Sequence, residues 1–382
     1  MLASFFLDRC LKAGIRFFSG VPDSFLKGLC DELYTRYGTS SPHHIVAHNE
    51  GGAVSLCAGH YLGTGHPALC YMQNSGLGNA VNPITSLMDQ KVYGIPCLLV
   101  IGWRGEPGTK DEPQHIQQGA ITLSQLDLLN IPYRILSSDT SDDDFLNDFD
   151  VLYNHLSTGR MAAFVIRKGV FQSCVHPDYS NAYHMSREKA AEIILSSLSD
   201  TDLVVSTTGK LSREIFEIRE KNHQLHDHDF LTVGSMGHAS MIALGMAESL
   251  PHLRIWCLDG DGAVLMHMGA LALIGQRQPH RMVHVVIDNG AHETVGGLPV
   301  CGGSLNLNGL SMASGYPQRL MADSEESLHS ALAIIHASPE NGPFFLDVKC
   351  ACGARKDLGR PTTTPEANKN MLMEFVTKSS QF

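Results

Sequence analysis

Short apolar runs alternate with longer helix-type segments along most of this chain, and this alternation restricts the possible folds more than any other sequence feature. The runs are almost continuously apolar and rich in branched residues, as in 97–102 (CLLVIG). Strands of this kind are buried on both faces, which is typical of a parallel sheet covered by helices. The strands predicted in the first half are 17–20, 44–48, 68–72, 97–102 and 162–167, with helices at 4–13, 25–37, 51–62 and 79–91.

The same pattern restarts after residues 171–186, a polar stretch that contains Pro177 and has no usable periodicity. We predict that this stretch is a linker. Beyond it, strands are predicted at 203–206, 254–258, 283–287 and 344–348, and helices at 187–198, 212–221, 239–249 and 263–276. A length of 382 residues agrees with two domains. The sequence therefore predicts α/β architecture with two doubly wound parallel-sheet domains, 1–170 and 187–382, and no middle domain.

The charge balance disfavours several classes of partner. Lys and Arg total 28 against 39 for Asp and Glu, a formal net charge of −11 at pH 7. An acidic surface opposes non-specific binding to nucleic acid or anionic membrane, so an anionic substrate would need a local basic pocket. The ten cysteines suggest no disulfide framework, and no signal peptide or spanning helix is recognisable, so we expect a cytoplasmic protein. The acidic run 142–150 is expected to begin a solvated helix.

Residues 254–291 combine features that would hold a diphosphate and a metal ion. The strand 254–258 is followed by DGDG (259–262) and a helix, and the strand 283–287 is followed by DNGA (288–291). Glycines let backbone N–H groups approach a phosphate, and a helix N-terminus favours negative charge there. Asp261, Asn289 and the carbonyl of Ala291 offer the hard oxygens that Mg2+ prefers. A GDG sequence alone also makes an ordinary turn, but this order of elements favours the diphosphate site.

This arrangement resembles the diphosphate motif of the thiamine diphosphate (ThDP) enzyme superfamily. The resemblance implies two domains of the ThDP-binding fold, a pyrimidine-binding domain followed by a diphosphate-binding domain. One departure is Asp288, which stands where the motif usually has the first of two asparagines. The metal ligand is the second, Asn289, so the departure leaves the site plausible.

The resemblance also implies an activating glutamate that hydrogen-bonds the aminopyrimidine of the cofactor and so promotes formation of the ylid. Glu50 follows the strand 44–48 and opens the next helix, as that residue does in the superfamily. An acid that only stabilises the helix dipole is the alternative interpretation. In such enzymes the first domain of one chain faces the second domain of another. Glu50 and Asp261 are therefore expected to belong to different subunits of at least a homodimer.

Further cofactor contacts are implied in the same way. Met236, in GSMGHA, matches the apolar residue that supports the bent cofactor, and an ordinary core methionine is the alternative. The residues expected to contact the cofactor are Glu50, Gly209, Ser235, Met236, Gly260, Asp261, Gly262, Ala263, Asn289 and Ala291.

Most ThDP decarboxylases of pyruvate-like acids carry a third domain between these two. This chain has only a short linker there, and in this it resembles the compact phosphonopyruvate and sulfopyruvate decarboxylases. The motifs that carry this resemblance span almost the whole chain. They are GVPDS (20–24), HNEGGAVSLCAG (48–59), QNSGLGNAVNPITSL (73–87), GWRG (102–105), DEPQH (111–115), TGKLSRE (208–214), GSMGHAS (234–240), GDG (260–262), NGAHETVGG (289–297) and ARKDLGRP (354–361). NGAHETVGG and TGKLSRE favour the phosphonopyruvate branch.

The reaction implied by the resemblance is decarboxylation of 3-phosphonopyruvate to phosphonoacetaldehyde and CO2, through an ylid and an enamine. Such an anionic substrate requires Arg and Lys donors, although ordinary solvated surface is the alternative for these basic residues. Asp23, in GVPDS, and His292 are candidates for proton transfer, and a turn-forming aspartate is the alternative for Asp23. The candidate substrate-binding residues are Gln73, Asn74, Arg104, Lys110, His115, Arg355 and Arg360.

Two other functions stay open at this point. One is a ThDP enzyme for another 2-oxo acid, chiefly sulfopyruvate, or a ligase that passes the enamine to an acceptor. The other is a non-catalytic nucleotide- or metal-binding α/β protein.

Overall fold

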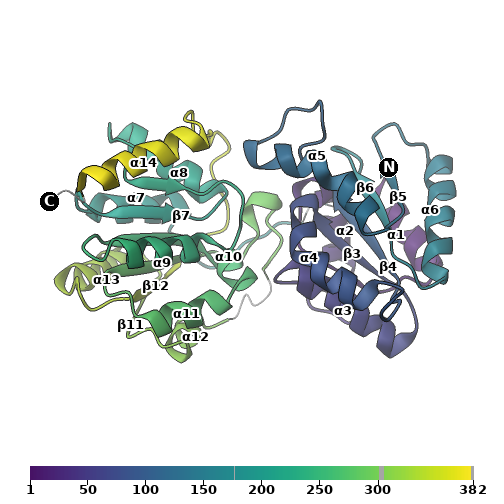
Figure 1. The fold of residues 1–382 in the computed structure, drawn as a ribbon, viewed down its shortest axis with the longest axis horizontal. Coiled ribbons are helices and arrows are strands. Elements are labelled where there is room, and N and C mark those ends of the chain that lie inside the picture. Colours follow the sequence, from purple (N-terminus) through teal and green to yellow (C-terminus); the bar gives the residue numbers. More distant parts are fainter. Residues whose placement is uncertain (176, 301–304, 380–382) are drawn as a thin grey trace. The chain divides into compact units, whose positions relative to one another are not determined.

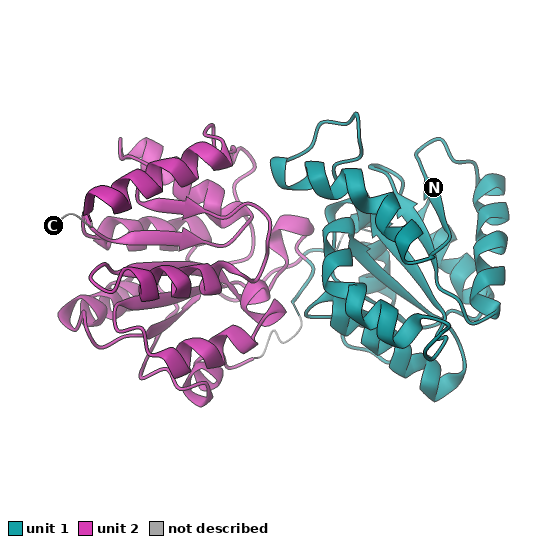
Figure 2. Ribbon diagram, in the orientation of Figure 1, with its two compact units in different colours: residues 1–178, 298–301 teal, residues 179–297, 302–382 magenta. Residues whose placement is uncertain are grey.

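The computed structural model describes residues 1–175, 177–300 and 305–379, which form two compact units, each with its own sheet (Figure 1). Unit 1 comprises residues 1–178 with 298–301, and unit 2 comprises 179–297 with 302–382 (Figure 2). The chain first passes from unit 1 to unit 2 between residues 178 and 179, inside the polar stretch 171–186.

Unit 1 contains six parallel strands in the order β2-β1-β3-β4-β6-β5. The chain begins at β1, moves to β2 at one edge and then crosses back to β3 on the other side, so the unit is doubly wound. The strands are β1 (Phe18–Gly20), β2 (His44–Val46), β3 (Ala68–Gln73), β4 (Cys97–Gly102), β5 (Tyr133–Leu136) and β6 (Ala162–Ile166). The helices are α1 (Ala3–Lys12), α2 (Lys27–Tyr37), α3 (Glu50–Thr64), α4 (Leu77–Pro83), α5 (Pro113–Leu128) and α6 (Asp142–Ser157), with 3-10 turns at Ser24–Leu26 and Asn74–Gly76 and a π-helical turn at Ile84–Met88.

Unit 2 contains six parallel strands in the order β11-β12-β10-β9-β7-β8, and its strand order reverses between β7 and β9. The strands are β7 (Leu203–Ser206), β8 (Asp229–Leu231), β9 (Ile255–Gly260), β10 (Met282–Asp288), β11 (Gln318–Ala322) and β12 (Phe344–Lys349). The helices are α7 (Arg187–Ser197), α8 (Lys210–Lys221), α9 (Ala239–Ser249), α10 (Asp261–Met266), α11 (Gly269–Arg277), α12 (Leu307–Ala313), α13 (Glu325–Ala337) and α14 (Pro365–Ser379), with a 3-10 turn at Glu293–Val295.

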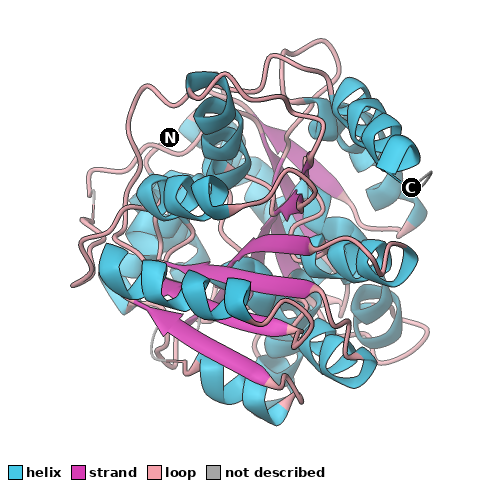
Figure 3. Cartoon of the chain, turned by 90° about the vertical axis from the view of Figure 1, so that its left-hand side faces the viewer, coloured by secondary structure: helices cyan, strands magenta, loops and turns pink. Residues whose placement is uncertain are grey.

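Helices lie on both sides of the strands (Figures 1 and 3), which is why the central strands are apolar on both faces. In β9, Trp256 and Leu258 join one apolar cluster, whereas Ile255 and Cys257 join a cluster on the opposite face. This alternation follows from the two-residue period of a strand. The predicted fold class is confirmed, and no middle domain is evident among the described residues.

Two of the predicted helices differ from the observed ones. The helix predicted at 263–276 begins at Asp261 and is interrupted at His267, whose backbone leaves the helical region (φ −133°, ψ 51°) while its ring packs against His238. The helix predicted at 79–91 begins at Leu77 and ends in the π-helical turn after Pro83, since a proline offers no N–H to the regular ladder. The expected helix at the acidic run is confirmed as α6, with Ser141 as its N-cap. In the described part of the chain, every helix is too short or too polar to cross a bilayer.

Candidate active site

The carboxyl end of the unit 1 sheet holds five of the predicted site residues. Asp23 follows β1, Glu50 follows β2, Gln73 ends β3, Asn74 comes directly after it, and Arg104 follows β4. Ligands of open α/β sheets bind at this end of the strands, where the strand order reverses. In unit 1 the reversal lies between β1 and β3, and a hydrogen bond from Gln73 Nε2 to Asp23 Oδ1 (2.6 Å) spans it.

Glu50 is the first residue of α3, and its side chain is buried, with the residue only 5% exposed. Asn49 caps the helix by accepting a hydrogen bond from the N–H of Gly52 (2.7 Å). The Glu50 carboxylate accepts a hydrogen bond at Oε2 from Asn79 Nδ2 (2.9 Å). Gly76 provides the space for this side chain, because a Cβ atom there would lie 2.5 Å from Glu50 Oε1.

Asp23 is fully buried between β1, β3 and β4. Besides the contact with Gln73, its Oδ2 accepts a hydrogen bond from the N–H of Phe25 (2.9 Å). Gly102 lies so close to the carboxylate that any Cβ atom at that position would overlap Oδ2. Burial raises the pKa of Asp23 even though these hydrogen bonds and the Arg104 guanidinium act in the opposite direction. The carboxyl therefore holds a proton more readily than an ordinary aspartate.

Asn74 and Arg104 hold the loops after β3 and β4 together. Asn74 is buried, and its Nδ2 donates to the carbonyl of Arg104 (2.7 Å), while its Oδ1 accepts from the Arg104 N–H (3.2 Å). The Arg104 guanidinium donates through Nε to Asp111 Oδ2 (2.8 Å) and through Nη1 to Ser24 Oγ (3.1 Å), and its Cζ lies 4.9 Å from the centre of the Phe25 ring. These contacts fix the guanidinium at the carboxyl end of the sheet.

His115 and Lys110 belong to the same loop and the helix after it. His115, on α5, is buried, its Nδ1 has no hydrogen-bond partner among the described residues, and burial together with Arg104 lowers its pKa to about 4. Lys110 is exposed on the loop surface.

The carboxyl end of the unit 2 sheet joins the two halves of the predicted metal motif. Asp261 begins α10 after β9, and Asn289 follows β10. The N–H of Gly290 donates to Asp261 Oδ2 (2.8 Å), and the N–H of Ala291 donates to Asn289 Oδ1 (3.1 Å). Asp261, Asn289 and Ala291 are 6%, 6% and 8% exposed. Burial, and next the nearby carboxylate of Asp288, raise the pKa of Asp261 to about 8.

Two glycines with positive φ keep the backbone open beside this motif. Gly209 (φ +110°), after β7, would place a Cβ atom 2.7 Å from Thr294 Oγ1, and Gly237 (φ +86°), before α9, would place one 2.9 Å from the carbonyl of Ala263. Ser235 (φ +46°) is exposed, and Met236 is partly exposed rather than enclosed in the core. Gly260, Gly262 and Ala263 form the junction from β9 into α10.

Comparison with known proteins assigns a protein family to each of the two units. Residues 1–128 match the family model described as thiamine pyrophosphate enzyme, N-terminal TPP binding domain, and residues 207–348 match the C-terminal TPP binding domain of the same enzymes. A phosphonopyruvate decarboxylase of Streptomyces viridochromogenes is 33% identical over 95% of this chain and 92% of its own length, and one of Streptomyces hygroscopicus is 31% identical over 96% and 91%. The chain belongs to the phosphonopyruvate decarboxylase family of thiamine pyrophosphate enzymes. More distant relatives are two shorter chains of Methanococcus maripaludis, the beta and alpha subunits of sulfopyruvate decarboxylase, which are 33% and 38% identical over 51% and 32% of this chain.

The residues of this family member fit a thiamine diphosphate bound through a divalent cation. Asp261 is a buried carboxylate beside a second carboxylate, Asp288, and a cation would relieve the repulsion between them. The amide oxygen of Asn289 lies in the adjoining turn. Gly209 and Gly237 leave no side chain where a diphosphate would approach the backbone.

Three further predicted residues belong to unit 2: Arg355, Arg360 and His292. The Arg355 guanidinium forms ion pairs with Glu188 of α7, Glu217 of α8 and the nearby Asp357. Arg360 is exposed further along the same segment. His292 follows Ala291 and is partly buried, and burial lowers its pKa to about 4.

Several contacts at these sites were not predicted from the sequence. Asn79 and Gly76, which hold and accommodate Glu50, are two of them. In unit 2, Asn181 Nδ2 donates to the carbonyls of Asn289 (2.9 Å) and Cys350 (2.9 Å), so the segment before α7 supports the metal motif. A small polar residue in a linker carries no pattern that would reveal such a role.

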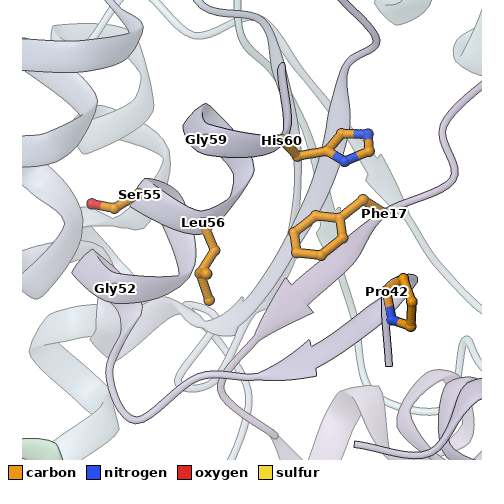
Figure 4. A pocket seen from close by; sticks show the side chains of 7 residues that line it. All are labelled: Phe17, Pro42, Gly52, Ser55, Leu56, Gly59 and His60. Atoms are coloured by element: carbon orange, nitrogen blue, oxygen red, sulfur yellow. The ribbon is translucent and has the colours of Figure 1, made fainter. Parts of the chain in front are cut away.

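A separate hollow of about 540 Å³ lies along α3 (Figure 4). The rings of Phe17 and His60 stack there, with centroids 4.9 Å apart, and small residues of α3 form much of the wall. The residues that line it are Phe17, Pro42, Gly52, Ser55, Leu56, Gly59 and His60. This lining contains no acidic residue and no arginine or lysine, so the hollow does not resemble a site for an anionic substrate.

Proposed function

We propose that the chain decarboxylates 3-phosphonopyruvate to phosphonoacetaldehyde and CO2, with ThDP and Mg2+ as cofactors. The observation that carries this proposal is the buried Glu50 of unit 1 together with the Asp261 and Asn289 pair of unit 2, in a chain similar to two phosphonopyruvate decarboxylases over nearly its full length. Residues 1–170 would be the pyrimidine-binding domain, 171–186 the linker, and 187–382 the diphosphate-binding domain with a C-terminal tail.

Each side chain has a defined task in this proposal. When bound, ThDP supplies a nucleophilic carbon and accepts the electrons that CO2 leaves behind. Asp261, Asn289 and the carbonyl of Ala291 hold Mg2+, while Gly209, Ser235, Gly260, Gly262 and Ala263 surround the diphosphate and Met236 supports the cofactor. Glu50 would hydrogen-bond the pyrimidine of bound ThDP and share a proton with it, and the hydrogen bond from Asn79 holds the Glu50 carboxylate in place for this role.

At the substrate end, Arg104 offers a fixed guanidinium beside Asp23, Gln73 and Asn74. Loss of CO2 as a neutral molecule leaves a carbon that must take up one proton. Asp23 can donate it, because burial favours its protonated form. His115 and Lys110 would add to the binding of the phosphonate. His292, Arg355 and Arg360 remain candidates, although Arg355 is engaged by three carboxylates.

The substrate proposal is tested by offering purified protein phosphonopyruvate, sulfopyruvate and pyruvate while CO2 and aldehyde are measured. We expect phosphonopyruvate to be turned over best, because its phosphonate carries more charge than a sulfonate and pyruvate carries neither. Equal or better turnover of sulfopyruvate would favour the second candidate function, which the similarity to the sulfopyruvate decarboxylase subunits supports.

The cofactor site is tested by calorimetric titration with ThDP and Mg2+. Asp261→Ala should abolish the binding, whereas Asp200→Ala, which removes an exposed aspartate of the same unit, should leave it unchanged. Binding that does not depend on Asp261 would refute the proposed metal site.

We further propose self-association, with Glu50 and Asp261 of one site supplied by different subunits. The sulfopyruvate decarboxylase of Methanococcus maripaludis has separate alpha and beta subunits, and the hollow along α3 offers small and apolar residues for contact. Mixing the inactive variants Glu50→Gln and Asp261→Ala should then restore part of the activity. No recovery after subunit exchange would refute a shared site. The expected compartment is the cytoplasm, consistent with the nine described cysteines, which are all free thiols.

A further inference from the structure

Lys349 forms a charge cluster with Asp288 and Asp347, next to the turn that carries Asn289. It ends β12, directly opposite Asp288 at the end of β10. Its Nζ forms an ion pair with Asp288 Oδ2 and a second one with Asp347 Oδ2 (3.0 Å). All three side chains are largely buried, with exposed fractions of 15%, 16% and 3% for Lys349, Asp288 and Asp347.

Asp288 is coupled to the metal motif through one N–H group. The N–H of Gly290 donates both to Asp288 Oδ1 (3.2 Å) and to Asp261 Oδ2 (2.8 Å). Two carboxylates therefore share one donor, which attracts both but cannot neutralise either. Asp288 therefore brings a second negative charge to the place where a diphosphate would approach.

We propose that Lys349 is a positioning residue for the cofactor, since its ion pair holds the Asp288 carboxylate in place and offsets its charge beside the proposed metal ligands Asp261 and Asn289. Without the ammonium group, Asp288 would repel both Asp261 and the diphosphate. It would also be free to turn toward the cation and distort the turn that presents Asn289. This inference rests on the proposed ThDP and Mg2+ site.

The proposal makes an ordered prediction for three variants. Lys349→Met leaves Asp288 unpaired and should weaken ThDP binding in the presence of Mg2+ about 10-fold or more, which is about 1.4 kcal/mol. Asp288→Asn keeps an oxygen acceptor for the Gly290 N–H and removes the unwanted charge, so binding should not weaken. The double variant Asp288→Asn/Lys349→Met should bind within about 3-fold of the parent protein, or about 0.7 kcal/mol.

The measurement is calorimetric titration of the full chain with ThDP and Mg2+, with thermal unfolding of the cofactor-free variants as a check on folding. Rescue by Asp288→Asn separates charge compensation from packing, because a Lys349 that only fills space would not be replaced by changing Asp288. Lys349→Met that binds like the parent, or a double variant as weak as Lys349→Met, would overturn the proposal. If Lys349→Met does not fold, the double variant decides: affinity like the parent supports the proposal, and weak binding overturns it.

Asp261→Ala distinguishes the two levels of inference. If the parent protein does not bind ThDP, or if Asp261→Ala binds it equally well, the proposed function itself fails. If Asp261→Ala abolishes binding but the three variants do not follow the predicted order, only the role of Lys349 is wrong.

Discussion

Gly76→Ala adds one methyl group that unit 1 cannot accept without moving Glu50. The new Cβ atom would lie 2.5 Å from Glu50 Oε1 and 2.6 Å from Glu50 Cδ. Non-bonded carbon atoms prefer separations of about 3.5–4.0 Å, so the carboxylate must move by roughly 1 Å. The backbone at Gly76 (φ −73°, ψ −15°) suits alanine, so the substitution introduces no backbone strain. The steric conflict with Glu50 is therefore the main effect.

The size of the effect follows from what Glu50 is proposed to do. Misplacing a reacting group by about 1 Å costs on the order of 100-fold in rate. At about 1.36 kcal/mol for each tenfold change, that is about 2.7 kcal/mol of activation free energy. The hydrogen bond from Asn79 to Glu50 would also be strained, at a cost of about 1 kcal/mol in stability. We expect kcat for phosphonopyruvate to fall about 100-fold while ThDP and Mg2+ still bind.

The assay is steady-state release of CO2 at saturating cofactor, and Gly78→Ala is the matched control. Gly78 lies two residues further along in α4, and a Cβ atom there would meet nothing within 4 Å. Its replacement should leave turnover unchanged and stabilise the helix by about 1 kcal/mol. A folded Gly76→Ala variant whose turnover lies within about 3-fold of that of Gly78→Ala would contradict this reasoning. Such a small loss, compared with the expected 100-fold, would mean that Glu50 is not the position-sensitive activator.

Three further variants test the remaining roles. Glu50→Gln should retain ThDP and Mg2+ binding, because an amide oxygen can still accept from Asn79, but lose at least about 100-fold in kcat; retained activity would show that the activator lies elsewhere. The folded chain binds the Asp23 proton more tightly than the unfolded chain, so Asp23 makes stability fall as pH rises from its ordinary pKa through its raised one. Urea unfolding of Asp23→Asn across that range should show a shallower fall, and an unchanged pH profile would contradict burial of this carboxyl. Arg104→Lys cannot reproduce the paired contacts with Asp111, so kcat/KM should fall by about 10-fold or more for phosphonopyruvate and much less for pyruvate, with Lys12→Met as an exposed control.

The central strands were predictable from the sequence, whereas of the four edge strands only β2 was predicted. β4 and β6 are buried along their whole length, so their sequences are continuously apolar. The strands missed at the sequence level are β5, β8 and β11, and each lies at an edge of its sheet. An edge strand has one neighbour and a partly exposed face, as the alternating exposure of β11 shows. Its residues are therefore too polar to stand out from loops.

The site residues divide in a similar way. Asp23, Glu50, Asp261 and Asn289 follow strands, and a parallel sheet brings all such positions in one unit to the same end. Their supporting residues depend instead on side-chain packing that no local pattern encodes. Asn79 reaches Glu50 across 29 positions of sequence, and Lys349 reaches Asp288 across 61. Periodicity and motif spacing do not extend over such separations.

The two aspartates of DGDG show why a motif needs the structure to be interpreted. Asp259 still belongs to β9, so its side chain points into the core, where it is fully buried and lies 3.6 Å from His284 Nε2, farther than a hydrogen bond. Asp261 comes two residues later, and in a continuing strand it would point to the same face. Because β9 ends at Gly260 and α10 begins at Asp261, the second carboxylate instead lies at the end of the sheet, against the Gly290 N–H. The change from strand to helix at this one peptide therefore separates a core aspartate from the proposed metal ligand.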